Sequence, residues 1–184
     1  EKDYQDLLHA LDPLGIGESM LQVGRAWFAH PLELAAAMTR FSGDLIGLQL
    51  HIWKRALGMP AEDVAPSHEA DSRFADPAWS NLPMWDTLKQ AYLTLTRDAV
   101  DMVYSTPELS IKERRRAAFW AKAMFNAVAP TNFFWTNPVA MQKFVESSGR
   151  SLAQGFEQFI EDVRAGDLRM VDTEPFQVGG NLAT

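Results

Sequence analysis

The sequence predicts an all-α protein: an irregular helical domain with an N-terminal helical arm and an extended C-terminal tail. Three observations predict this class. Apolar residues recur at helical spacing, Gly and Pro fall between the periodic segments, and no segment shows the sustained two-residue alternation that is typical of a strand. Hydrophobic residues make up 47% of the 184 residues and charged residues 22%, so the chain can bury a core and is not of the disordered class.

Residues 1–58 are expected to form an amphipathic helical arm. Two short helices are predicted over Tyr4–Leu11 and Glu18–Ala29, and each is followed by a proline two residues further on. A long helix is predicted over Leu32–Leu57, because its apolar residues follow a heptad seam. The seam consists of Leu34, Met38, Phe41, Leu45, Leu48 and Ile52.

The same long helix carries a second apolar stripe, so we expect it to be covered on two sides. The stripe consists of Ile46, Leu50, Trp53 and Leu57. Gly43 and Gly47 lie four residues apart and would allow another helix to approach closely, although a glycine inside a helix costs about 1 kcal/mol relative to alanine.

Residues 59–73 are rich in proline and acidic side chains and are predicted to be a linker, followed by a helical globular domain over residues 74–184. Thr106 is the expected N-cap of the domain's second helix, with Pro107 in its first turn. After Gly166 the periodicity ends, and Leu168–Thr184 is predicted to be extended. The predicted helices of the domain run over Pro83–Tyr104, Pro107–Val128, Pro138 to about Gly149, and from Ser151 to about Gly166.

Composition excludes several classes of function. The formal net charge of -7 would repel a nucleic acid, and no apolar run reaches the roughly 20 residues of a transmembrane span. The chain has no cysteine, so it can form neither a disulfide, a thiolate zinc site nor a cysteine nucleophile. We therefore expect no nucleic-acid partner and no membrane-spanning segment.

No catalytic, cofactor-binding or metal-binding residue is predicted. The four histidines lie in separate segments without the spacing of a metal site, and we interpret them as histidines that are on the surface or capped by a hydrogen-bond partner. A basic cluster that includes Arg114, Arg115 and Arg116 is interpreted as a solvated helix face, although it could dock a phosphate or an acidic partner.

Aromatic residues are the candidates for an interaction surface. Phe133, Phe134 and Trp135 are adjacent, so their side chains diverge and cannot all point into one core. A docking surface is one explanation for them, and ordinary core packing is the other. The full set of interaction candidates is Leu45, Leu48, Ile52, Trp53, Phe133, Phe134 and Trp135.

Four segments resemble the N-terminal region of polyhydroxyalkanoate synthases. They are DSRFADPAWSNLP at Asp71–Pro83, LKQAYL at Leu88–Leu93, APTNFFWTNP at Ala129–Pro138 and FQVGGNLA at Phe176–Ala183. Their order and spacing match over Asp71–Thr184. One departure is Gly180, where the family commonly has arginine. The arm resembles the family only in general character and leans toward class I, the short-chain, single-subunit type.

The resemblance implies a parent acyltransferase that polymerises (R)-3-hydroxyacyl groups from coenzyme A thioesters into a polyester. It implies a catalytic cysteine, histidine and aspartate in an α/β-hydrolase domain that is absent from this chain, so the chain alone is expected to be inactive and to need no cofactor. It also implies a cytoplasmic location at polyester granules. The implied partners are the catalytic domain, a second synthase subunit, and the granule surface or a phasin-type protein. The alternative hypothesis is a phasin-like coat protein whose long helix lies on a granule.

Overall fold

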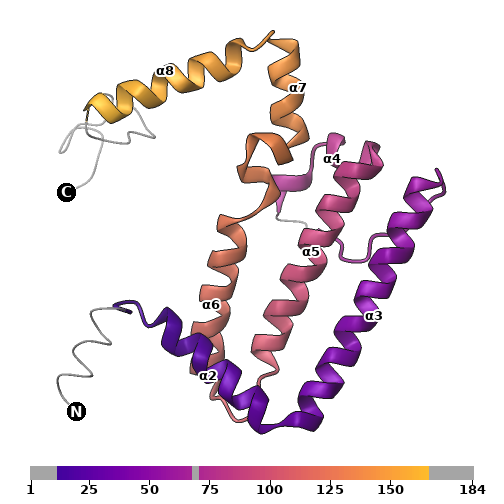
Figure 1. Ribbon diagram of the computed structural model, residues 1–184, viewed down its shortest axis with the longest axis vertical. Helices are drawn as coiled ribbons and strands as arrows, with labels where there is room; N and C mark the ends of the chain where they lie inside the picture. Colours follow the sequence, from indigo (N-terminus) through magenta and orange to yellow (C-terminus); the bar gives the residue numbers. More distant parts are fainter. Residues whose placement is uncertain (1–11, 68–70, 166–184) are drawn as a thin grey trace, which may run out of the picture. The chain divides into compact units, whose positions relative to one another are not determined.

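The computed structural model describes residues 12–67 and 71–165, which fold into helices joined by turns (Figure 1). Because these residues contain no strand, the all-α prediction is confirmed. The predicted helix Tyr4–Leu11 and the extended tail from Leu168 lie outside the described residues. The α-helices are α2 Ile16–Ala29, α3 Pro31–Ala56, α4 Ala78–Asn81, α5 Pro83–Tyr104, α6 Ile111–Ala127, α7 Pro138–Glu146 and α8 Arg150–Ala165, and the 3-10 helices are η1 Ser72–Phe74, η2 Pro130–Asn132 and η3 Phe134–Thr136.

The chain separates into two compact units, Glu1–Pro138 and Val139–Thr184. In the first unit α5 is the central helix, because α3, α4 and α6 each pack against it, while α2 packs against α6 and α3 (Figure 1). The second unit contains α8 and all of α7 after Pro138. The division into an arm, a linker and a globular domain stays a prediction.

The sequence signals at both ends of α3 explain its bounds. Pro31 lies in the first turn, where a backbone N–H would have no hydrogen-bond partner within the helix. The negative charge of Glu33 in the same turn interacts favourably with the positive end of the helix dipole. Lys54 and Arg55 lie in the last turn, at the negative end, and Gly58 follows with a φ of 71°, a conformation that favours glycine. The helix therefore matches its predicted bounds to within one residue.

The predicted start of α6 was wrong. Thr106 was expected to cap this helix, but its hydroxyl donates to the carbonyl oxygens of Met102 and Val103, at 3.1 and 2.8 Å, and so belongs to the end of α5. The cap of α6 is Ser110, whose side chain accepts from the backbone of Glu113 while the Glu113 side chain accepts from the Ser110 backbone. This reciprocal capping box satisfies two N–H groups and fixes the start at Ile111.

Aromatic rings from η1, α4 and α5 form one part of the core. Trp79 is fully buried, and its ring lies 4.9 Å from that of Phe74 and 6.3 Å from that of Trp85, both in edge-to-face geometry. The Phe74 ring in turn lies 5.7 Å from Tyr92. These rings bury large apolar areas, and edge-to-face contacts add further stabilisation. The short helices before α5 are thus held by aromatic packing.

Small side chains form the contact between α5 and α6. The buried cluster joins Val103 of α5 to alanines of α6, and Met20 of α2 packs against it. Because an alanine extends only to Cβ, the helix backbones can approach closely. The alanines are Ala117, Ala118 and Ala121.

We expect Ala118→Leu to destabilise this contact. Ala118 is fully buried, so the larger side chain must displace α5 or α2, at a cost of about 1–3 kcal/mol in the free energy of unfolding. Urea unfolding followed by circular dichroism measures the change. Ala123→Leu, at a half-buried position of the same helix, is the control and should cost less. Equal effects would show that the helices do not approach closely at Ala118.

Candidate docking surfaces and the ionic cluster that supports them

A buried ionic cluster joins α3 to α5, with the carboxylate of Asp86 at its centre. Asp86 is 3% exposed. His51 Nε2 and Arg55 Nε, both from α3, lie 2.9 and 2.8 Å from Asp86 Oδ2. Lys89 Nζ, one turn along α5, lies 3.1 Å from Asp86 Oδ1. The cluster therefore fixes one face of α3 against α5.

Neighbouring main-chain and hydroxyl groups complete this cluster. His51 Nδ1 lies 2.8 Å from the carbonyl oxygen of Glu62, which can only accept, so this ring nitrogen donates. Lys89 Nζ donates to Ser80 Oγ at 2.8 Å, and Arg55 Nη2 donates to the Ser80 carbonyl. Of the two interpretations of the histidines, a surface position does not apply to His51, which is 3% exposed and has a partner at each ring nitrogen.

The electrostatics of the cluster favour an ionised Asp86. Burial raises the pKa of a carboxyl group, but the hydrogen bonds from His51 and Lys89 outweigh burial and hold the pKa of Asp86 below its ordinary value. The aspartate is therefore a carboxylate at neutral pH, and its charge compensates those of buried or half-buried cations. Removing either side of this arrangement leaves an uncompensated charge in the interior.

The segment between α3 and α5 is fastened to α5. The side-chain oxygen of Gln90, which is fully buried, accepts from the backbone N–H groups of Val64 and Ala65, at 2.9 and 3.1 Å. Arg97 Nη1 donates to the Val64 carbonyl at 2.9 Å and Nη2 lies 3.0 Å from Asp44 of α3. These contacts occur within the segment that was predicted to be a linker.

A groove of about 460 Å³ lies beside this attachment and is lined by α3, α5 and Phe125 of α6. Arg97 and Asp98 reach it, but they pair with each other at 2.9 Å. Burial raises the pKa of Asp98 even though Arg97 is its partner. The groove thus presents mostly apolar side chains, among them Ala37, Met38, Phe41, Leu95, Ala99 and Met102.

The outer face of α3 is exposed along the helix. The second apolar stripe of the sequence lies on this face, with exposed fractions of 62% at Ile46, 57% at Leu50, 60% at Trp53 and 69% at Leu57. The helix was predicted to be covered on two sides, and within the described residues only the side toward α5 is covered.

The predicted seam differs from the buried face of α3 by a small rotation. Leu48 is buried, but Met38 and Leu45 are exposed, while Ala37 and His51, which were not in the seam, are buried. The rotation follows from a polar contact, because the buried face of α3 is the one that brings His51 to Asp86.

The interaction candidates from the sequence are spread over two elements. On α3, Leu45 and Trp53 are exposed, Ile52 is half-buried and Leu48 is buried. In and beside η3, Phe133 and Trp135 are exposed and Phe134 is half-buried. The rings of Phe134 and Trp135 lie 4.8 Å apart in edge-to-face geometry. Their role in binding stays a prediction.

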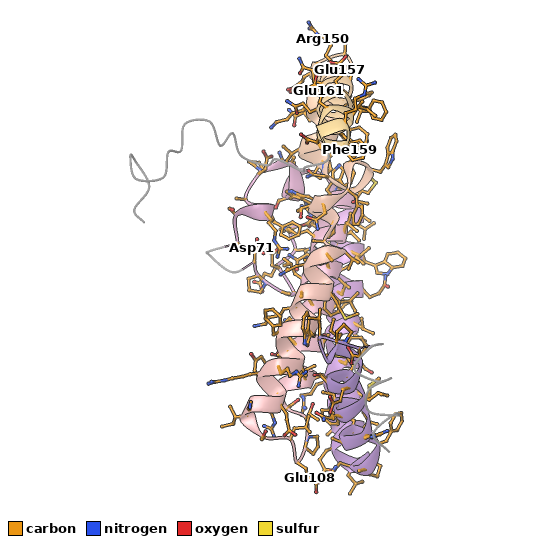
Figure 2. The ribbon with its side chains drawn as sticks, turned by 90° about the vertical axis from the view of Figure 1, so that its left-hand side faces the viewer. Asp71, Glu108, Arg150, Glu157, Phe159 and Glu161 are labelled. Carbon is orange, nitrogen blue, oxygen red and sulfur yellow. The ribbon has the colours of Figure 1, made fainter. Side chains whose placement is uncertain are left out.

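A third apolar surface belongs to α8. Four of its large side chains are exposed and recur at helical spacing, with acidic residues on the other side of the helix. Figure 2 labels Phe159 of this stripe, and Arg150, Glu157 and Glu161 among the polar residues of the helix. The exposed stripe consists of Leu152, Phe156, Phe159 and Val163.

Other kinds of site are not found among the described residues. No group of three or more metal-ligating side chains converges within residues 12–67 and 71–165. In the same part of the chain, no helix combines the length and the apolar character that a membrane crossing requires.

The known proteins that this chain resembles in sequence include several with closely similar names. A poly(3-hydroxyalkanoate) polymerase subunit PhaC of Rhizobium meliloti (strain 1021) is 33% identical over 170 residues, which are 90% of this chain and 28% of the relative. The corresponding subunit of Cupriavidus necator is 32% identical over 83% of this chain and 25% of the relative. Poly(3-hydroxyalkanoate) polymerase 1 of Ectopseudomonas oleovorans is 36% identical over 84% of this chain and 26% of the relative.

The chain thus spans less than a third of the length of these curated relatives. No solved structure matches it. The family model described as the poly-beta-hydroxybutyrate polymerase (PhaC) N-terminus matches residues 70–184, which are more than half of the chain. Three of the four segments that suggested the resemblance lie between Asp71 and Pro138 and include Phe74 and Trp79 of the aromatic core as well as η3, whereas Phe176–Ala183 lies outside the described residues. The chain therefore belongs to the family of polyhydroxyalkanoate polymerase N-terminal domains.

Proposed function

We propose that this chain is the non-catalytic N-terminal domain of an acyltransferase that polymerises (R)-3-hydroxyacyl-coenzyme A into polyester with release of coenzyme A. In this role it supports the catalytic part of the enzyme and provides surfaces for a second synthase subunit and for the granule surface or a phasin-type protein. The observation that carries the proposal is the family match to the polymerase N-terminus, over a chain that spans less than a third of its relatives.

The chemistry of the chain supports a non-catalytic role. The chain contains no cysteine, so the thiol nucleophile that the family resemblance implies must come from the remainder of the enzyme. The most polar buried group, the Asp86 cluster, has its carboxylate in contact with side chains of its own fold rather than directed into a pocket. Its task is structural, because it holds α3 on α5.

The α8 stripe supports docking on the rest of the enzyme. Phe156 and Phe159 are more than half exposed, although phenylalanine side chains normally bury most of their area. The opposite side carries Glu157 and Glu161 together with Arg150 and Arg164, so it lacks the excess of positive charge that an anionic lipid surface attracts, and this favours a protein partner. We therefore assign α8 to the contact with the catalytic part.

A chimera tests the proposed function. This chain replaces the matching region of the Rhizobium meliloti relative, and release of coenzyme A from (R)-3-hydroxybutyryl-coenzyme A is followed. We expect activity within about tenfold of the unaltered relative, while the relative without that region loses far more. In the chimera, Phe156→Glu with Phe159→Glu should lower activity by about tenfold or more, because two apolar anchors of the contact are replaced by charges.

The matched control changes the acidic side of α8, as Glu157→Gln with Glu161→Gln, and should leave activity unchanged. An inactive chimera whose helical content is intact would overturn the proposal, and equal rates for the two double variants would remove α8 from it. The alternative, a phasin-like coat protein, predicts that the 184-residue chain coats polyester particles by itself and that the chimera is inactive.

Deleting residues 1–58 would not be a clean test of the arm. The deletion removes His51 and Arg55 and leaves Asp86 and Lys89 buried without these partners. Any loss of function could then follow from unfolding. Substitutions on exposed faces avoid this difficulty.

A further inference from the structure

We propose that the outer face of α3 is a self-association site, which binds α3 of a second copy of this chain in antiparallel orientation. The proposal deepens the proposed function, on which its biological role rests, because it assigns the contact between synthase subunits to one helix face. Figure 1 shows α3 at the edge of the first unit, with α5 on one side of it.

The outer face forms a continuous heptad stripe along α3. Its residues alternate in steps of four and three, which is the spacing of the seam of a two-helix coiled coil, and every one of them is exposed. From Leu32 to Leu57 the stripe runs for about 37 Å at 1.5 Å per residue. Its residues are Leu32, Ala36, Thr39, Gly43, Ile46, Leu50, Trp53 and Leu57.

The sizes of these side chains match in an antiparallel pair. A two-fold axis between Gly43 and Ile46 places the large residues of the central layers opposite small residues of the other copy, and places leucine against leucine at the two ends. Ile46 then faces the second copy's Gly43, and Leu50 and Trp53 face small side chains in the next two layers. The complete set of layers is Ile46 with Gly43, Leu50 with Thr39, Trp53 with Ala36, and Leu57 with Leu32.

Gly43 gives this arrangement independent support. Glycine inside a helix costs about 1 kcal/mol relative to alanine. A Cβ atom added at Gly43 would meet no other atom within 4 Å, so nothing among the described residues requires glycine there. At Gly47, by contrast, the added Cβ would lie 3.7 Å from Val64. Close approach of a second helix explains why α3 has no side chain at position 43.

Charges beside the stripe select the same orientation. Glu33 and Lys54 lie on the same flank of the stripe, at opposite ends of α3. In the antiparallel pair, Glu33 of each copy lies beside Lys54 of the other, so two opposite-charge pairs form. A parallel pair would place Trp53 against Trp53 and Gly43 against Gly43, and no charged residue would lie across from Glu33 or Lys54.

The inner face of α3 is already occupied, which keeps the outer face in one orientation. His51 and Arg55 point to Asp86 on α5, and Asp44 pairs with Arg97. The stripe is therefore presented by a helix that is fixed before the second copy binds, and this lowers the entropic cost of association.

Cross-linking of paired cysteines tests the orientation, because the chain has no cysteine of its own. In the antiparallel register, position 42 of one copy lies beside position 49 of the other. We expect an equal mixture of the Ser42→Cys chain and the Gln49→Cys chain to give a covalent dimer with a short bismaleimide. Each variant alone should give none, because its own thiols are displaced by seven residues, about 10 Å along the helix.

Charge exchange tests the same register without a cross-linker. Glu33→Lys and Lys54→Glu should each weaken self-association by about fivefold in sedimentation velocity. The double variant should return to within about twofold of the original chain, although both new charges are unfavourable for the helix dipole. A double variant that is weaker than both single variants would overturn the proposal.

Gly43→Leu tests the central layer. Leucine favours the helix, so the monomer should stay folded, but its side chain should weaken the dimer by at least about tenfold. Gly24→Leu on α2, where an added Cβ also meets nothing within 4 Å, is the control and should leave association unchanged. A chain that is monomeric at about 100 µM overturns self-association, whereas the proposed function fails only if the chimera is inactive.

Discussion

Asp86→Asn is expected to lower the free energy of unfolding by about 3–5 kcal/mol. The substitution keeps the size of the side chain and removes its charge. Lys89 and His51, both buried, would then face a neutral amide, and Arg55 would lose the carboxylate that lies 2.8 Å away. Breaking a buried charge arrangement costs more than the arrangement contributes, because the remaining charges stay in the interior. Urea unfolding followed by circular dichroism measures the loss.

The matched control for this prediction is Asp101→Asn, which changes an exposed aspartate of the same helix. Its effect should stay within about 0.5 kcal/mol. Hydrogen exchange adds a spatial test, because the loss at Asp86 should expose the amides of α3 before those of α6. Equal destabilisation by the two asparagine variants would show that the cluster does not hold α3 on α5.

The stabilisation by Asp86 should depend on pH in a defined direction. The pKa of Asp86 in the fold is lower than its ordinary value of 3.8. Its contribution is therefore complete above about pH 4 and is lost as the pH falls through the lower folded-state pKa. Burial raises the pKa of Asp98 instead, so the stability of the original chain relative to Asp98→Asn should decrease as the pH rises through that pKa. The difference in the free energy of unfolding between the original chain and Asp86→Asn should therefore increase with pH, whereas the difference from Asp98→Asn should decrease with pH.

Trp79→Ala is expected to cost about 3–5 kcal/mol of the free energy of unfolding. The indole is fully buried, and it contacts the rings of Phe74 and Trp85. Its removal leaves a cavity at the junction of η1, α4 and α5, which rigid helices cannot fill by a small shift. The melting temperature and the urea midpoint should both fall.

Trp135→Ala is the control for the loss of a tryptophan. Trp135 is 76% exposed, so its removal should change the free energy of unfolding by no more than about 0.5 kcal/mol. In the chimera it should leave the fold intact and thereby report on binding alone. If both tryptophan variants were equally stable, the aromatic cluster would not be a core.

Most helices could be predicted from the sequence because their signals are local. For α5, Pro83 at the start and the apolar face ending near Tyr104 gave the observed bounds. For α6 two competing signals lay four residues apart: Thr106 and Pro107 resemble a helix start, but Ser110 with Glu113 forms the real one. Glu108 between them has a φ of 59°, a left-handed conformation that changes the direction of the chain. No local sequence pattern predicted this conformation.

The Asp86 cluster could not be predicted because it depends on tertiary contacts. His51 and Asp86 are 35 residues apart in sequence, and neither is unusual in its own helix. A signal did exist, since His51 and Arg55 interrupt one apolar face of α3 while Asp86 and Lys89 interrupt a face of α5. Polar groups of opposite sign on two buried faces indicate that these faces meet. The second apolar stripe of α3 was recognised but was expected to be covered, because the side that α5 covers depends on that pairing.

The attachment of Val64 and Ala65 to Gln90 also determines where the polypeptide can be divided. A break near Pro60 would leave one piece that contains α2 and α3. The other piece would contain Val64, Ala65 and Gln90 and would keep the hydrogen bonds among them. Glu62 would stay with the second piece and could still accept from His51. The two pieces should therefore reassemble when they are produced together. That property would turn the domain into a fragment-complementation reporter whose signal depends on one buried carboxylate.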